Sequence, residues 1–212
     1  MAVSNDRLLE AARRTIAHVK ADTVPLAETI AKVPAEHYLD HDRWLSELRS
    51  LFHRFPLVFG FSCEFVERFS YRSTEVMGVP VLVSRAADDT LRAFVNVCSH
   101  RGARVVAEGA GTTRRFTCPY HAWSYDNSGQ LVGILDHDQF GEVDMDCNGL
   151  TELPVLERAG LVFVGLNHEG TPDLERYLCG YEEMLEHLGL ADCYLTGQQT
   201  VDGPNWKIAY DG

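Results

Sequence analysis

The sequence predicts a mainly β fold of small antiparallel sheets, preceded by a helical arm and followed by a segment that mixes helix and strand. Short runs rich in β-branched and aromatic residues succeed one another between residues 57 and 166. Apolar residues recur at helical spacing before residue 56 and again after residue 172. The chain has 212 residues, of which 45% are hydrophobic, a content that is ordinary for a folded protein.

Two helices are expected before the first strand. Residues 4–20 space Leu, Ile and Val at helical intervals with Arg and Lys between them, which is typical of an amphipathic helix. Residues 24–33, bounded by Pro25 and Pro34, predict a linker that can include one helical turn. Asp40 or Asp42 is expected to cap a second helix, which ends before Pro56.

The strands are expected to form an antiparallel system joined by short turns. A Gly-rich turn at 109–111 is expected to pair residues 105–106 with 114–117, and Asp-Asn-Ser-Gly at 126–129 predicts a hairpin. Residues 136–149 are acidic and predict an exposed loop. The expected strands are Leu57–Phe61, Tyr71–Met77, Val79–Ser84, Leu91–Val97, 123–125, 130–135, Leu153–Arg158 and Leu161–Leu166.

The C-terminal part returns to helical spacing. Pro172 is expected in the first turn of a helix, and a second helical segment is expected from Tyr181. Residues 194–201 resemble a strand in composition. They lead into Asn205-Trp206-Lys207.

Two Cys-and-His pairs stand out between the expected strands: Cys98-x-His100 and Cys118-x2-His121. Thiolate sulfur and neutral imidazole nitrogen are ligands that iron and zinc share. A pair separated by one residue fits poorly with the usual ligand spacing of structural zinc. The pattern fits a [2Fe-2S] centre in which two Cys hold one iron and two His hold the other, each loop giving one ligand to each iron.

The pattern resembles the cluster-binding signature of Rieske proteins, and most of all that of ring-hydroxylating oxygenase alpha subunits. Asn96, Arg101-Gly102 and Trp123 add to the resemblance. Ala103 and Tyr120 stand where cytochrome bc-type Rieske proteins would carry a disulfide, and Ala122 stands at the family's usual Gly. The resemblance implies a Rieske domain, a [2Fe-2S] cofactor and a redox-active iron bound by histidine.

The C-terminal residues carry a second resemblance. Asn205-Trp206-Lys207 with Asp211 is similar to the opening of the catalytic domain in those alpha subunits. In the family, two later His residues and a carboxylate hold a mononuclear Fe(II), and these residues are not among the 212. The resemblance therefore implies a helical arm at 1–38, a Rieske domain at 39–168 and the α+β start of a truncated catalytic domain at 169–212.

The function implied is electron transfer within an O2-dependent aromatic ring-hydroxylating oxygenase. A ferredoxin or reductase is expected to supply the electrons, and a homotrimer or an alpha-beta hexamer is the expected full-length assembly. Two alternatives stay open: a free-standing Rieske ferredoxin, and a structural zinc module. The ferredoxin would need only about residues 55–166, so the helical arm and the C-terminal segment favour the oxygenase.

Charge and hydropathy exclude some partners. The formal net charge of −12 argues against a nucleic acid or an anionic membrane surface, since both require clustered Lys and Arg. Asp6, Arg7 and Glu10 interrupt the N-terminus where a signal peptide needs an apolar run. A cytoplasmic protein is expected.

Overall fold

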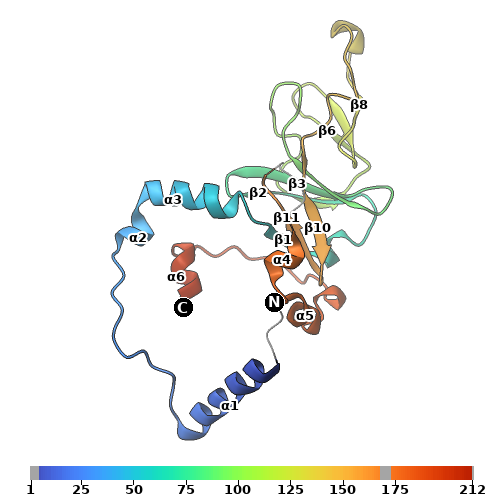
Figure 1. Ribbon diagram of the computed structural model, residues 1–212. Helices are drawn as coiled ribbons and strands as arrows, with labels where there is room; N and C mark the ends of the chain where they lie inside the picture. Colours follow the sequence, from blue (N-terminus) through green and yellow to red (C-terminus); the bar gives the residue numbers. More distant parts are fainter. Residues whose placement is uncertain (1–4, 168–172, 212) are drawn as a thin grey trace.

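The computed structural model describes residues 5–167 and 173–211 (Figure 1). Three antiparallel sheets form the body of the molecule, as the sequence predicts. Their strands are β1 (Leu57–Phe61), β2 (Ser70–Val76), β3 (Val79–Arg85), β4 (Leu91–Val95), β5 (Gly109–Thr112), β6 (Arg115–Thr117), β7 (Ser124–Asp126), β8 (Leu131–Gly133), β9 (Glu152–Leu153), β10 (Val155–Arg158) and β11 (Leu161–Val164).

The five-stranded sheet, in the order β5-β2-β3-β4-β9, carries hydrophobic residues on both faces. Successive side chains of a strand point to opposite faces, so Val81 and Val83 pack on one side and Leu82 on the other. The first side meets the sheet β1-β11-β10, and the second side meets the sheet β6-β7-β8. The five-stranded sheet therefore lies between two stacked cores, and the second of them contains both predicted cysteine ligands.

One predicted strand pairing is wrong. Gly109–Thr112 is not a turn but strand β5, which pairs with Ser70–Ser73 of β2, while β6 pairs with β7. Gly111 is closely approached by the ring of Tyr71, where an added Cβ would come within 3.1 Å of the hydroxyl oxygen. These small residues let the backbone of β5 lie against β2 beside that aromatic side chain, a use of glycine in strands that turn rules do not capture.

The other predicted hairpins are confirmed. Strands β7 and β8 flank the turn at residues 127–130, and Ala159 and Gly160 join β10 to β11 with φ values of +50° and +79°. Within residues 136–149 the structure adds a short helix, η3 (His137–Gln139), and Figure 1 shows this loop extending from the top of the domain.

The N-terminal helices follow the prediction with one addition. They are α1 (Asn5–Ala21), α2 (Glu36–Leu39), α3 (His41–Glu47) and the π-helical turn η1 (Leu48–Phe52). Asp40 caps α3 by accepting a hydrogen bond of 2.6 Å from the amide of Arg43. Helix α2 was not expected. Figure 1 shows α1 standing apart from the sheets at the end of an extended segment.

The C-terminal part is helical. It contains α4 (Leu174–Leu178), α5 (Glu182–His187), η4 (Leu190–Asp192) and α6 (Trp206–Asp211). A further short helix, η2 (Ser62–Phe65), lies between β1 and β2. Pro172 lies outside the described residues. The strand expected at 194–201 is wrong, because none of the strands that the structure describes pairs with this exposed segment. In the described part of the chain, no helix is long and apolar enough to cross a membrane.

Residues far apart in sequence meet around Glu47, which is 8% exposed. Its carboxylate accepts hydrogen bonds from Lys207 at 2.7 and 2.8 Å, from the Trp206 indole at 3.0 Å and from Arg43 at 3.0 Å. The side-chain amide of Asn205 donates a hydrogen bond of 3.0 Å to the backbone carbonyl of Tyr38. The Asn-Trp-Lys motif thus joins the C-terminal helix to α2 and α3.

Candidate metal centre

The two predicted ligand loops have the same backbone design. The first follows β4 and the second joins β6 to β7. In each loop the cysteine carbonyl accepts from the amide four residues later, Gly102 or Ala122, at 2.9 and 3.0 Å. Those two residues have φ values of +74° and +56°. Each cysteine amide donates to the carbonyl five residues later at 2.8 Å, so the loops present their side chains from equivalent frames.

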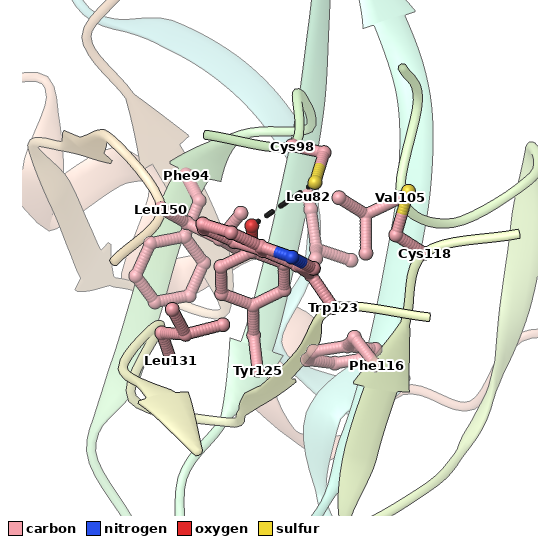
Figure 2. Packing of buried hydrophobic residues seen from close by; sticks show 10 residues of the cluster. All are labelled: Leu82, Phe94, Cys98, Val105, Phe116, Cys118, Trp123, Tyr125, Leu131 and Leu150. Carbon is pink, nitrogen blue, oxygen red and sulfur yellow. Dashed lines mark hydrogen bonds between the residues drawn. The ribbon is translucent and has the colours of Figure 1, made fainter. Parts of the chain in front are cut away.

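The two sulfur atoms lie deep in the core. Cys98 is 3% exposed and Cys118 is 2% exposed, and both belong to the cluster drawn in Figure 2. Burial raises the pKa of the Cys118 thiol and the neighbouring Cys98 raises it further, while the backbone amides of Tyr120 and His121 hydrogen bond to its sulfur and lower it. Two neighbouring buried thiols beside amide donors suit a metal centre, because each thiol would release its proton and bind the metal as a thiolate.

The two imidazoles form a second pair. The ring centroids of His100 and His121 are 4.8 Å apart, and both residues are partly exposed. Burial of the ring lowers the pKa of His100, with smaller contributions from His121 and Arg101. The Nδ1 atom of His121 is buried and has no hydrogen-bond partner among the described residues. A buried ring nitrogen without a partner is costly, and coordination to a metal would satisfy it.

These observations test whether the side chains fit a [2Fe-2S] cluster. The sulfur atoms of Cys98 and Cys118 form one pair, and the imidazoles of His100 and His121 form another. The arrangement of one sulfur pair and one nitrogen pair is what two irons with different ligands require. The donor set therefore fits the cluster.

Tyr125 approaches the sulfur side from β7. Its hydroxyl lies 3.1 Å from the Cys98 sulfur and 2.9 Å from the Ser99 hydroxyl, and it accepts a hydrogen bond of 3.1 Å from the Ser99 amide. Burial and the neighbouring Cys98 raise the pKa of the Tyr125 phenol, so this group keeps its proton at neutral pH. A metal-bound thiolate has no proton, so Tyr125 must be the donor to Cys98 when metal is bound.

Asn96 supports the first loop from below. It is completely buried, and its side-chain amide donates to the Ser73 hydroxyl and to the carbonyl of Val106. Its carbonyl oxygen accepts from the amides of Val105 and Val106 at 3.1 and 3.0 Å. Asn96 thus holds residues 105–106, which follow the first ligand loop, against β2. This gives a structural reason for the asparagine that precedes the ligands in the Rieske signature.

Two aromatic residues at the histidine pair had no predicted role. Trp123 stacks on His100 with a centroid distance of 4.8 Å and an interplanar angle of 9°, and Phe140 meets the same imidazole edge-on at 5.4 Å. Trp123 was noted only as part of the resemblance. Phe140 comes from the loop at 136–149, and no spacing in the sequence connects it with residue 100.

The chain matches a known protein family. Residues 57–152 match the model of the family described as "Rieske [2Fe-2S] domain". The glycine betaine monooxygenase oxygenase subunit of Pseudomonas aeruginosa (strain UCBPP-PA14) is 28% identical over 204 residues, covering 96% of this chain and 46% of the relative. The chlorobenzene dioxygenase subunit alpha of Cupriavidus sp. (strain PS12) is 31% identical over 180 residues, covering 81% and 39%.

Solved structures agree. The apo form of the quaternary ammonium Rieske monooxygenase CntA has a TM-score of 0.78 at 29% identity, covering 85% of this chain and 53% of the other. Naphthalene 1,2-dioxygenase from Rhodococcus sp. bound to indole has a TM-score of 0.69 at 27% identity, covering 87% and 40%. The chain spans about half the length of the relatives it matches or less. The chain therefore carries a Rieske [2Fe-2S] domain at residues 57–152 and is similar, over most of its length, to Rieske oxygenase alpha subunits.

Proposed function

We propose that Cys98 and Cys118 hold one iron of a Rieske [2Fe-2S] cluster and that His100 and His121 hold the other. The single observation that carries this proposal is the pairing of side chains by two loops of equivalent design, sulfur with sulfur and imidazole with imidazole. The unpartnered Nδ1 atom of His121 supports it independently.

When bound, such a cluster accepts and releases one electron, and its reduction potential exceeds that of an all-cysteine cluster. The protein buries the cysteine side and leaves the histidine side partly exposed. Tyr120, which is 59% exposed, lies against the ring of His121 with a centroid distance of 3.7 Å. Electrons therefore enter and leave at the histidine edge, where the layer of protein is thinnest.

The whole protein is proposed to be an O2-dependent oxygenase, either a dioxygenase or a monooxygenase. A ferredoxin or reductase supplies electrons, which pass through the cluster to a mononuclear non-haem iron in a catalytic domain that opens within residues 169–212. A homotrimer or an alpha-beta hexamer is the proposed assembly. The relative from P. aeruginosa aligns over 204 residues, well beyond the Rieske domain, which favours an oxygenase subunit over a free-standing ferredoxin.

The substrate class has two candidates. Aromatic ring hydroxylation was expected from the resemblance, and the chlorobenzene dioxygenase subunit supports it. Glycine betaine monooxygenase and CntA, named for quaternary ammonium compounds, match the chain at least as broadly. Product analysis of the full-length oxygenase, reconstituted with a reductase and offered benzene or glycine betaine separately, distinguishes these classes.

The ligand assignment is tested by replacing Cys118 with Ser. Anaerobically purified parent protein should contain two irons and two acid-labile sulfides per chain and give a rhombic EPR signal after reduction. Cys118→Ser should lose both, because a serine hydroxyl is a poor ligand for cluster iron. Cys63→Ser is the matched control, since Cys63 is only partly exposed and has no place at the centre, and it should keep the full signal.

Two results would contradict the proposal. Retention of the parent signal in Cys118→Ser would remove Cys118 from the ligand set. A colourless parent protein that binds one zinc per chain would support the structural zinc alternative instead.

A further inference from the structure

Trp123 is enclosed between the predicted ligands and the core. The residue is 4% exposed and belongs to the same packed cluster as both cysteines (Figure 2). One face of its indole lies parallel to the His100 imidazole, 4.8 Å away. Phe140 closes the arrangement by meeting the indole at 6.1 Å and the imidazole at 5.4 Å. The His100 ring therefore cannot rotate without displacing two aromatic side chains.

The indole N–H of Trp123 is also without a partner. Among the described residues, three buried side-chain nitrogen or oxygen atoms lack a hydrogen bond: Ser62 Oγ, His121 Nδ1 and Trp123 Nε1. Two of the three belong to one ligand loop and are only two residues apart in sequence. Buried donors are rarely left unsatisfied, because a donor that loses its hydrogen bonds to water and gains none destabilises the fold. An acceptor enclosed beside this loop would satisfy the indole.

We propose that Trp123 is a positioning residue for the cluster, stacking on His100 to fix its ring and donating its indole N–H to a sulfur atom of the cluster. The inference rests on the proposed cluster and deepens it. The acceptor must be enclosed because the donor is buried, and the sulfur atoms are the acceptors that the cluster brings to this loop.

The proposed hydrogen bond has an electrochemical consequence. A donor aimed at sulfur stabilises the more negative, reduced state more than the oxidised state, and so raises the reduction potential. Stacking acts differently. It limits the angle of the His100 ring about its bond to iron, and this angle contributes to the shape of the EPR spectrum.

The variant test separates the two effects. Trp123→Phe keeps an aromatic face against His100 and removes the N–H, so its cluster should have a lower potential with an EPR line shape close to the parent. Trp123→Leu removes both and should also broaden the EPR lines. Trp44→Phe is the matched control, because Trp44 packs on Phe52 in the helical region and should leave the potential unchanged.

A label in the unmodified sequence tests the contact even where a variant loses its cluster. The chain has three tryptophans. Incorporating [indole-15N]tryptophan should add a nitrogen coupling to the pulsed EPR spectrum of the reduced protein, and Trp44→Phe should keep this coupling.

A loaded parent protein without that coupling, or a loaded Trp123→Phe variant with the parent potential, would overturn the inference while leaving the proposed function intact. A parent protein that holds no cluster would instead refute the proposed function.

Discussion

At the scale of single residues, the ligand loops depend on two left-handed backbone positions. Gly102 and Ala122 occupy equivalent places, four residues after each cysteine, and both have positive φ. Glycine adopts this conformation at no steric cost, whereas alanine is strained by about 1 kcal/mol. The hydrogen bond from the Ala122 amide to the Cys118 carbonyl holds the alanine there, so the departure from the family's usual glycine leaves the loop intact.

Replacement of Asn96 by Ala should destabilise the domain by about 2 to 4 kcal/mol, because it leaves the amides of the buried Val105 and the partly buried Val106 without acceptors. Urea unfolding followed by circular dichroism measures this change. The exposed Gln198→Ala is the control and should stay within about 0.5 kcal/mol of the parent. A near-parental midpoint for Asn96→Ala would mean that β2 and the first loop do not depend on this residue.

At the scale of elements, the five-stranded sheet is shared by two cores. Its β3 strand sends alternate residues into each, so the sheet that supports the metal centre is itself supported by β1, β10 and β11. The helices are joined differently, through the buried carboxylate of Glu47 on α3. Hydrogen bonding to Lys207 is the largest influence on this carboxyl and lowers its pKa below the ordinary 4.5, with Trp206 and Arg43 contributing.

This lowered pKa predicts an acid-sensitive link between α3 and α6. A carboxylate with a depressed folded-state pKa stabilises the fold fully above its unfolded value, and loses that contribution as the pH falls through the folded value. Attachment of α6 should therefore weaken below about pH 4.5 in the parent protein. Trp206 fluorescence in a Trp44→Phe, Trp123→Phe background reports this attachment.

In that background, the Glu47→Gln variant should hold α6 only weakly against α3 at neutral pH, and its fluorescence should show no acid transition. Glu108→Gln, which changes an exposed carboxylate, is the control and should keep the transition. An acid transition that persists in Glu47→Gln would assign it to another group.

At the scale of the whole molecule, the N-terminal arm is separate from the body. Every described residue from 6 to 37 is exposed, apart from a partly exposed His18. Ile30 is 92% exposed. Figure 1 shows the arm reaching away from the sheets before the chain enters α2. An arm of this kind contributes little to the stability of the body, since it buries almost no apolar surface there.

Deletion of residues 1–30 should therefore leave the EPR spectrum unchanged and keep the melting temperature within about 2 °C of that of the 212-residue chain. Differential scanning calorimetry and EPR of the reduced protein measure these quantities. Deletion of residues 193–211, which includes the partners of Glu47, is the contrasting variant and should lower the melting temperature. A large loss of stability on removing the arm would show that it packs on the body in solution.

The sequence by itself predicted the candidate ligands and determined most of the strands. Four side chains at two short spacings form the proposed ligand set, because ligand type and local spacing survive in any fold that forms those turns. Runs of β-branched residues predicted β1 to β4, since these residues favour the extended backbone of a strand wherever it lies in the fold. Helix α3 was predicted from its cap and apolar stripe for the same local reason.

Only the tertiary structure decided which segments meet. The pairing of β5 with β2, the approach of Phe140 to His100 and the burial of Glu47 under Lys207 join residues 36 to 160 positions apart. Such contacts follow from how the sheets and helices stack, and no local pattern encodes that stacking. The strand expected at 194–201 was wrong for the same reason: a strand needs a neighbouring edge to pair with, and no strand within residues 5–167 and 173–211 pairs with it.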